Sequence, residues 1–434
     1  MIQTDPVMAR KARWASLVGT SLESYDFYIY AYFAAFFVGP LFFDPLGGFG
    51  GTLAAFLSIA LAFIIRPVGA ILFGHIGDRI GRRKTLIATV TLMGVATGLI
   101  GVLPTYDQAG WFGAAILVVL RLLQGISMGG EWGGAILVAT EHESGAKRAF
   151  AAAMPQLGSP IGSILSATAF IWLTLALTND EIVEWAWRLP FLSAIPLLLV
   201  SLYLRLAITE TPVFEDVVKR ERRPRVPFFT LLKEQPMAIF IAVAVALLGI
   251  GSYSLMNTYT INYGVVQLGF QYYELLIATT IGGLLQLITI PLFGAWAVRI
   301  GSASVVAWGA LGTLLVAFPI YYFLQFANFG VLVAMMLIGG TLPTMSWAAL
   351  GGVYSDLFDE RYRYSALGFS YSIAAVVSGF VPAVTLTIGQ ATGNVWWHPA
   401  IVLAGLSLIT LLATLQAGRM ARSNQEPAYA RTGN

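Results

Sequence analysis

Long apolar stretches separated by short polar connections recur along the whole chain of 434 residues. A helix of roughly 20 apolar residues is long enough to cross the hydrocarbon core of a bilayer. The pattern predicts twelve such helices, which we expect at residues 14–39, 52–74, 84–103, 112–140, 150–177, 187–206, 237–266, 271–297, 302–324, 328–352, 365–388 and 397–416. The sequence therefore predicts an all-α integral membrane protein with twelve transmembrane helices.

Composition agrees with this pattern and excludes several other classes of protein. The chain is 57% hydrophobic and 11% charged, whereas about 25% of the residues of a soluble domain are charged. It contains no cysteine, which excludes disulfides, a thiolate nucleophile and a Cys-ligated metal site. The three histidines, His75, His142 and His398, show no metal-ligand spacing and no nucleophile beside a base. We therefore expect no enzymatic activity, no cofactor and no metal.

One long polar connection divides the predicted helices into two sets of six. We expect six-helix bundles at residues 1–206 and 237–434, joined by a linker at 207–236. A receptor or scaffold would need a sizeable soluble module, and this linker is the longest polar segment of the chain. The pattern is typical of a protein whose function lies within the membrane.

The distribution of basic residues predicts the orientation. If both termini lie on the same side, nearly all of the 25 Lys and Arg residues fall in the termini and connections of that side. The opposite connections hold only Arg188. Because Lys and Arg accumulate on the cytoplasmic side of membrane proteins, we expect both termini and the linker to be cytoplasmic. The basic cluster at 219–225 follows the same rule, so no nucleic-acid binding is expected.

Away from the helix ends, five charged residues fall within the predicted membrane helices: Glu23, Asp26, Arg66, Arg121 and Glu131. Each costs at least ~2.5 kcal/mol at bilayer depth unless it is paired or hydrated. At about 1.5 Å per residue, Glu23, Asp26 and Arg121 reach similar depths near the midplane. Glu23 and Asp26 are three residues apart and share one helix face.

Two carboxylates in a partly dehydrated site cannot both ionise cheaply, and a nearby Arg holds one of them ionised. Such a group suits proton coupling, because the acid takes a proton when substrate occupies its cationic partner. A static ion pair that locks two helices is the alternative. For Arg66 and Glu131, which lie toward the cytoplasmic side, the static pair is the favoured interpretation.

Uncharged polar side chains recur at helical spacing on other predicted helices. Such faces either line a shared cavity, where they hydrogen-bond a solute, or hold neighbouring helices together. Their recurrence in both halves favours a cavity. The candidate substrate-binding residues are Arg121, Gln124, Tyr30, Gln156, Tyr253, Asn257, Gln286, Trp347 and Tyr371.

The connection at residues 74–84 is short, charged and rich in glycine. Read as G-x-x-G-D-R-x-G-R-R-K, it resembles the signature between helices 2 and 3 of the major facilitator superfamily. Other stretches resemble its bacterial metabolite:proton symporter group, which includes carriers for shikimate, 2-oxoglutarate, citrate and proline or betaine. These stretches are Leu22–Phe27, Arg66–Ala70, Arg121–Gly125, Gly129–Gly134 and Glu210–Phe214.

The resemblance implies two bundles that rock about a central site in a bacterial inner membrane, with a gate on the cytoplasmic side. The gating residues would be Gly74, Gly77, Asp78, Arg79, Gly81, Arg82 and Arg83, together with Arg66 and Glu131. The equivalent stretch Gly294–Gly301 keeps Arg299 but has no Asp, so we expect two gates of unequal strength. The connection at 354–364, with Asp356 and Arg361, is charged enough to latch against the first gate.

These observations predict a monomeric secondary transporter in the lipid bilayer that couples uptake of a small organic acid to protons by alternating access. Arg121 would bind the substrate carboxylate and release Asp26, the first choice of coupling acid, or Glu23, the second. A single midplane Arg favours a monocarboxylate such as shikimate. The closest alternative substrate is a zwitterion such as proline or betaine, whose ammonium would pair with one of the acids. An organic anion uniporter or exchanger is a further alternative.

Overall fold

The computed structural model describes residues 6–80, 82–141, 155–206, 235–358 and 363–425. Within these ranges the side chains of residues 6–13, 15–16, 74–75, 77–80, 82–83, 130–141, 155, 204–205, 355, 363–365, 367 and 421–425 are not described. All regular elements in the described ranges are helices, as the apolar pattern predicts.

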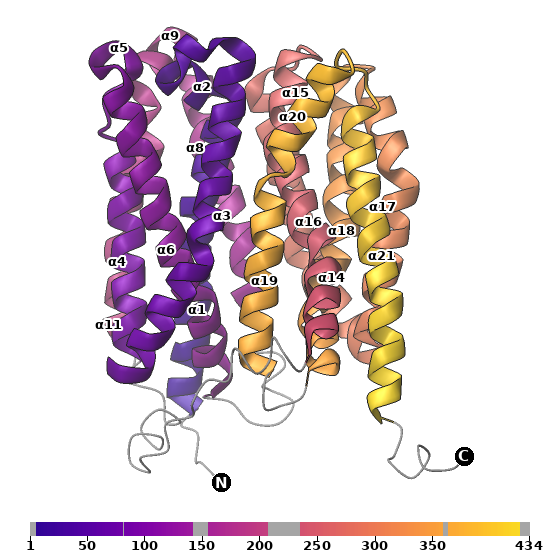
Figure 1. Cartoon of the computed structure of the whole chain (residues 1–434). Coiled ribbons are helices and arrows are strands. Elements are labelled where there is room, and N and C mark those ends of the chain that lie inside the picture. The colour runs from indigo at the N-terminus through magenta and orange to yellow at the C-terminus, as the bar shows by residue number, and fades with distance from the viewer. Residues whose placement is uncertain (1–5, 81, 142–154, 207–234, 359–362, 426–434) are drawn as a thin grey trace.

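The helices form two groups that lie side by side (Figure 1). The N-terminal group contains α1 (Pro6–Phe36), α2 (Val38–Phe42), α3 (Gly47–Ile80), α4 (Arg82–Ile100), α5 (Tyr106–Ala109), α6 (Trp111–Glu141), α8 (Gly158–Ala176), α9 (Asn179–Glu181), α10 (Arg188–Leu192) and α11 (Ala194–Leu206). The C-terminal group contains α14 (Pro236–Ser254), α15 (Thr260–Val266), α16 (Tyr272–Ile300), α17 (Ser302–Leu324), α18 (Phe329–Leu357), α19 (Arg363–Gly379), α20 (Val381–Ala391) and α21 (His398–Gln425). Helix α1 begins and α21 ends at the lower end of the molecule in Figure 1, and "lower" and "upper" are used below in this sense.

Nine helical segments of the described ranges are long and apolar enough to cross a membrane, and a bent pair, Asn179–Ala186 with Arg188–Tyr203, makes a tenth. The other two predicted spans correspond to α4, whose apolar part Lys84–Ile100 is short, and to α1, which carries Glu23 and Asp26. The predicted all-α membrane fold is therefore confirmed.

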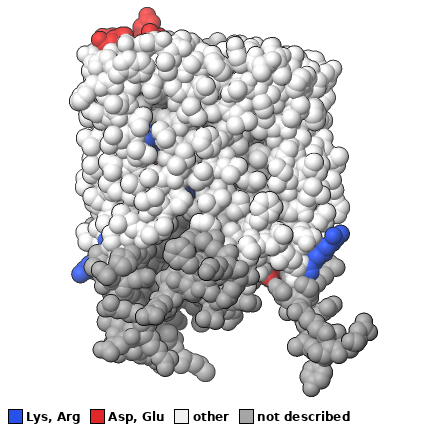
Figure 2. Space-filling view, viewed as in Figure 1, with Lys and Arg blue, Asp and Glu red and all other residues white. Residues whose placement is uncertain are grey.

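The surface between the two ends is almost uncharged in the view of Figure 2. Large apolar side chains are exposed on the helices, for example Val298 (84%), Tyr203 (74%) and Phe240 (70%). Exposed apolar surface of this extent is unusual for a soluble protein. It suits a molecule whose sides contact hydrocarbon, where each helix satisfies its own backbone hydrogen bonds.

The prediction of a loop at residues 74–84 is wrong. Helix α3 continues to Ile80 and α4 begins at Arg82, so only Gly81, which lies outside the described residues, separates them. Arg and Ile are adequate helix formers, and each glycine costs only about 1 kcal/mol in a helix interior. The fall in hydropathy therefore marks the end of the apolar part of α3. It does not mark the end of the helix, which continues to Ile80.

Three other predicted helices are interrupted. The span expected at 365–388 breaks at Phe380. Pro382 in the first turn of α20 has no N–H and cannot continue the backbone hydrogen bonds of the preceding helix. The span at 237–266 contains a π-helical turn, η4 (Leu255–Tyr259). The span at 187–206 belongs to the bent pair, whose axes differ by 42°. The span at 150–177 is helical from Gly158, and residues 142–154 lie outside the described residues.

Close glycine contacts fix the crossing of α3 and α6. A Cβ atom on Gly125 would lie 2.1 Å from the Ala62 carbonyl oxygen, and one on Gly129 would lie 2.1 Å from the Arg66 carbonyl oxygen. Only glycine permits such an approach, and small residues commonly form close helix contacts in membranes. The crossing holds Arg66 on the side of the N-terminal group that faces the C-terminal group.

Candidate functional site

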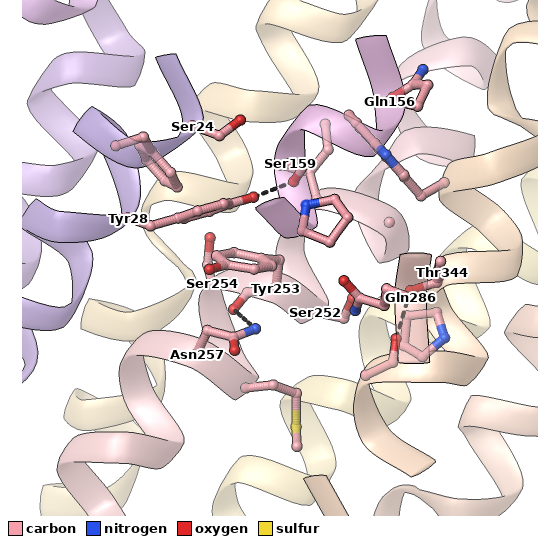
Figure 3. A pocket seen from close by; sticks show the side chains of 18 of the residues that line it. Ser24, Tyr28, Gln156, Ser159, Ser252, Tyr253, Ser254, Asn257, Gln286 and Thr344 are labelled. Atoms are coloured by element: carbon pink, nitrogen blue, oxygen red, sulfur yellow. Dashed lines mark hydrogen bonds between the residues drawn. The ribbon is translucent and has the colours of Figure 1, made fainter. Parts of the chain in front are cut away.

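A cavity lies between the two groups of helices, and we call it the central cavity. Its volume is about 140 Å³, counted as the space that the centre of a water molecule can occupy. Helices α1, α3, α6 and α8 line it from the N-terminal group, and α14, η4, α16, α18 and α19 line it from the C-terminal group. Both halves thus contribute to one site, which Figure 3 shows from close by.

Polar side chains make up much of the lining. Hydroxyl, amide, indole and charged groups come from Thr20, Glu23, Ser24, Tyr28, Arg66, Gln156, Ser159, Ser252, Tyr253, Ser254, Asn257, Gln286, Thr344, Trp347 and Tyr371. The apolar part includes Phe27, Phe63, Met128 and Pro343. A few convergent polar groups within an otherwise apolar pocket are typical of small-molecule sites.

Six of the nine predicted substrate-binding residues line this cavity: Gln156, Tyr253, Asn257, Gln286, Trp347 and Tyr371. Trp347 and Tyr371 pack together with ring centroids 5.8 Å apart. The amide of Asn257 donates to the Tyr253 carbonyl oxygen at 3.4 Å. The structure therefore brings together residues that are more than 200 positions apart in the chain.

Sequence reasoning missed several lining residues. The serines Ser252 and Ser254, with Thr344, were not predicted to line the site. Thr20 and Tyr28 were also missed, although with Ser24 they repeat at a spacing of four on α1, which is a usable helical signal. Tyr28 forms a hydrogen bond with Ser159 (Figure 3), and its ring lies 4.4 Å from that of Tyr253.

An acid and a base face the central cavity from the N-terminal group. Glu23 on α1 is partly exposed there, and Arg66 on α3 is buried. Tyr371 of α19 interacts electrostatically with both and is hydrogen-bonded to Arg66. The Arg66 guanidinium carbon lies 5.1 Å from the centre of the Tyr371 ring. The cavity thus holds two opposite charges of the N-terminal group, and Tyr371 of the C-terminal group interacts with both.

Asp26 does not line the central cavity. It is 7% exposed and lines a small second cavity, the inner cavity, between α1, α4 and α11. Glu23 lines both cavities. The two acids therefore share a face of α1, as their spacing predicts, and Glu23 stands between the two cavities.

Arg121 is 1% exposed and lies outside the lining of both cavities. Its guanidinium carbon lies 3.8 Å from the centre of the Tyr30 ring. Its Nη1 donates to Gln124 at 2.7 Å, and its Nε donates to the Ser58 carbonyl oxygen at 3.5 Å. The predicted residues Tyr30, Arg121 and Gln124 thus form a cluster of their own inside the N-terminal group.

The halves are joined above the central cavity by contacts that we call the upper latch. The Tyr272 hydroxyl donates to the Tyr32 carbonyl oxygen at 2.8 Å, and the Asn262 amide donates to the Ala35 carbonyl oxygen at 2.7 Å. The Tyr272 ring also stacks on Phe36 at 5.6 Å. These contacts close the upper side of the site. Sequence reasoning did not find them, because single donors to backbone oxygens leave no repeating pattern.

The predicted gating residues lie toward the lower end, and only some are described. Arg299, in the last turn of α16, and Asp356, near the end of α18, are exposed. Gly81, Arg361 and the side chains of Asp78, Arg79, Arg82, Arg83 and Glu131 lie outside the described residues, and Gly74 and Gly77 are known only as positions in α3. Among the described residues no group of three His, Asp or Glu could hold a metal ion.

Two helical groups around a shared polar cavity, with an apolar outer surface, define a multi-pass membrane carrier. The sequence model of the Major Facilitator Superfamily matches residues 27–339. The chain therefore belongs to the major facilitator superfamily.

Curated relatives cover nearly the whole chain. The inner membrane metabolite transport protein YhjE of Escherichia coli is 34% identical over 94% of this chain and 95% of its own length. The shikimate transporter of the same species is 33% identical over 94% of each chain. Other relatives, at 28% to 31% identity, are named as transporters of proline and betaine.

The fold is also that of a solved structure. The D-xylose-proton symporter matches with a TM-score of 0.75 at 19% identity, over 95% of this chain and 98% of that one. Because it belongs to this superfamily and its relatives are metabolite transporters, the chain is a secondary transporter of small metabolites that crosses the membrane several times, and it is not an enzyme.

Proposed function

We propose that this transporter carries a small monocarboxylate together with a proton, taking both up by alternating access. The observation that carries the proposal is the pair Glu23 and Arg66 in the central cavity, among neutral hydroxyl and amide groups. A cation that binds a carboxylate, an acid that takes a proton and neutral donors for hydroxyl groups are the parts that such transport needs. The shikimate transporter among the relatives supports this substrate class.

Arg66 fits the role of carboxylate anchor in this conformation. A guanidinium can hold both oxygens of a carboxylate through two parallel hydrogen bonds, and Arg66 is the cation that lines the central cavity within the described residues. The sequence favoured Arg121 as the residue that binds the carboxylate, but Arg121 packs on Tyr30 and does not line the central cavity. Arg121 therefore acts on the substrate only if another conformation exposes it.

Asp26 remains our first choice for the acid that stores the coupling proton, with Glu23 as the second. Asp26 is buried between helices of the N-terminal group, where its charged form is costly. Glu23 stands between Asp26 and the central cavity. In the proposed cycle, the substrate occupies Arg66, the acids take a proton and the neutralised site switches sides.

The charge distribution supports the proposed orientation, with both termini and the lower end in the cytoplasm. Among the described residues, five exposed acids occur in the upper connections (Asp44, Asp107, Asp180, Glu181 and Glu184) and one, Asp356, at the lower end of α18, and exposed bases occur at lower helix ends (Lys84, Arg299 and Arg419). Figure 2 shows most of the visible acidic side chains at the upper edge, and basic side chains with one small acidic patch near the lower edge. With this orientation the upper latch closes the periplasmic side. The bundles at 1–206 and 237–434 with a linker at 207–236, and the monomeric state, stay predictions.

Purified protein in proteoliposomes should accumulate a hydroxylated monocarboxylate such as shikimate when the outer medium is more acidic than the lumen. The pH gradient supplies the free energy through the coupled proton. The measurement is uptake across a panel of organic acids, with and without the gradient and with a protonophore. Uptake that the gradient leaves unchanged, with intact exchange of labelled substrate, would identify a uniporter or exchanger.

A zwitterionic substrate is the second candidate, and one observation favours it. Glu23 faces the same cavity as Arg66, so an ammonium and a carboxylate of one solute could bind both. Relatives named as proline and betaine transporters belong to the same set. The same panel decides: competition by proline or betaine, with none by shikimate, would favour this candidate.

Tyr272→Phe should loosen the upper latch, because it removes the hydrogen bond to the Tyr32 carbonyl oxygen and keeps the ring. A lost hydrogen bond of about 1 kcal/mol corresponds to roughly a fivefold shift of the conformational equilibrium. The chain has no cysteine, so Ser24→Cys reports access to the central cavity without background. We expect an impermeant maleimide added from the upper side to label this cysteine about fivefold faster.

Tyr322→Phe is the matched control, since Tyr322 is exposed at the end of α17 and lies outside the latch. It should leave the labelling rate unchanged. Equal rates in the Tyr272→Phe variant and the parent would mean that the hydroxyl does not hold the halves together.

A further inference from the structure

The inner cavity has features that the transport cycle above leaves unexplained. It lies wholly within the N-terminal group, between α1, α4 and α11. It offers about 20 Å³ to the centre of a water molecule, and roughly 10–15 Å³ is enough for one water. Its oxygen-bearing side chains are Glu23, Asp26 and Ser201. The cavity therefore has room for one small polar ligand beside two carboxyl groups.

The Ser201 hydroxyl is an independent sign of such a ligand. Ser201 is 1% exposed, and its Oγ has no hydrogen-bond partner. A buried hydroxyl left unpaired is costly, and a helical serine commonly avoids this by donating to the carbonyl four residues earlier. Ser407 and Ser166 of this chain bond in that way, at 2.7 and 2.8 Å. Ser201 instead lines the inner cavity, where a ligand would satisfy it.

We propose that the inner cavity binds one water molecule, held by Ser201, Asp26 and Glu23, and that this water passes the coupling proton between the two acids. The Glu23 carboxyl gives its proton to the water while the water gives another to the Asp26 carboxylate. One O–H bond breaks at Glu23, one forms at Asp26, and the water is unchanged. Three polar partners lie within the usual range for a buried water. The proposal rests on the proton coupling proposed above.

Glu23 and Asp26 are the titratable groups in the described lining of the inner cavity. From α4 the cavity is lined by Val90, Met93 and Gly94, and from α11 by apolar residues and Ser201, so neither helix adds a titratable group to the described lining. On the other side of Glu23, Arg66 and Tyr371 face it across the central cavity. Tyr25 interacts electrostatically with Asp26 from the same helix. Arg121 packs on Tyr30, outside the inner cavity. Glu23 is thus the described acid that faces both the substrate site and the inner water.

The test is the Ser201→Ala variant of the full chain in proteoliposomes. Removing the hydroxyl takes away one of the three partners of the water but no titratable group. We expect the initial rate of accumulation driven by a pH gradient to fall about tenfold, equivalent to about 1.4 kcal/mol. Counterflow of labelled substrate at equal pH should stay at the parent rate, which also shows that the variant is folded. Ser201→Thr, which keeps a hydroxyl, should recover most of the rate.

The matched control is Ser127→Ala, which removes a buried serine hydroxyl of the same bundle that donates to the Thr89 carbonyl oxygen at 2.6 Å. It should leave the ratio of gradient-driven to counterflow rates unchanged. An unchanged ratio in Ser201→Ala, or an equal loss of both rates, would overturn the relay while the proton coupling of the parent stands. A parent protein without a response to the gradient would overturn both proposals. Stimulation of the parent by Na⁺ that Ser201→Ala lacks would replace the water by a sodium ion.

Discussion

Asp26→Asn should reduce gradient-driven accumulation to the level that the unaltered protein reaches without a gradient. The amide keeps the shape of the side chain but cannot take up a proton, so the switch no longer depends on the pH difference. Counterflow should continue, because exchange of substrate at equal pH needs no net proton transfer. Both rates are measured in the same proteoliposomes with labelled substrate.

Asp107→Asn is the control, since Asp107 is an exposed acid in α5 that lines neither cavity. It should keep both rates.

Glu23→Gln separates the two acids, because Glu23 lines both cavities. If Asp26→Asn and Glu23→Gln both retained accumulation, the coupling proton would reside elsewhere. If only Glu23→Gln lost it, Glu23 would be the storing acid.

Arg66→Ala should weaken the apparent affinity for a monocarboxylate between about tenfold and about 150-fold. This range corresponds to the roughly 1.5–3 kcal/mol that hydrogen bonds to charged groups contribute. The half-saturating concentration in counterflow is the direct measure. Arg66→Lys should recover only part of the loss, because an ammonium is a point charge that lacks the planar fork of a guanidinium.

Two further arginines make the assignment specific. Arg419→Ala removes an exposed cation near the end of α21, outside both cavities, and should leave the affinity unchanged. Arg121→Ala removes the cation that packs on Tyr30. A large affinity loss in Arg121→Ala with none in Arg66→Ala would contradict the proposed anchor, and would mean that a different conformation brings Arg121 to the substrate.

The fold could be predicted from hydropathy because each crossing of the bilayer must satisfy its own backbone, which leaves long apolar helices. Hydropathy does not define helix ends. Residues 74–84 illustrate this limit, because their charges and glycines indicate a loop, and the chain continues as α3 and α4 with one residue between them. Helix ends depend on backbone hydrogen bonds, which persist into water.

The site could be predicted in part, for a similar reason. Helical spacing selected Gln156, Tyr253 and Gln286, because a polar face in a membrane helix has few places to point other than a cavity or a neighbour. Depth along the helices favoured Arg121 over Arg66, but it does not show which side of a helix a residue occupies, and Arg66 is the one that lines the central cavity. Each lies on a helix of the N-terminal group, and the rotation of that helix at the glycine crossing of α3 and α6 decides which one faces the central cavity.

The upper latch has an asymmetric chemistry. Its donors are the side chains of Asn262 and Tyr272, but its acceptors are main-chain carbonyl oxygens of α1. Every residue type presents that oxygen, so replacements at Ala35 or Tyr32 leave the acceptor in place. Evolutionary drift on the α1 side should therefore be tolerated, whereas selection should act on the two donors. Among orthologues, the C-terminal half would then determine how firmly the upper entrance closes.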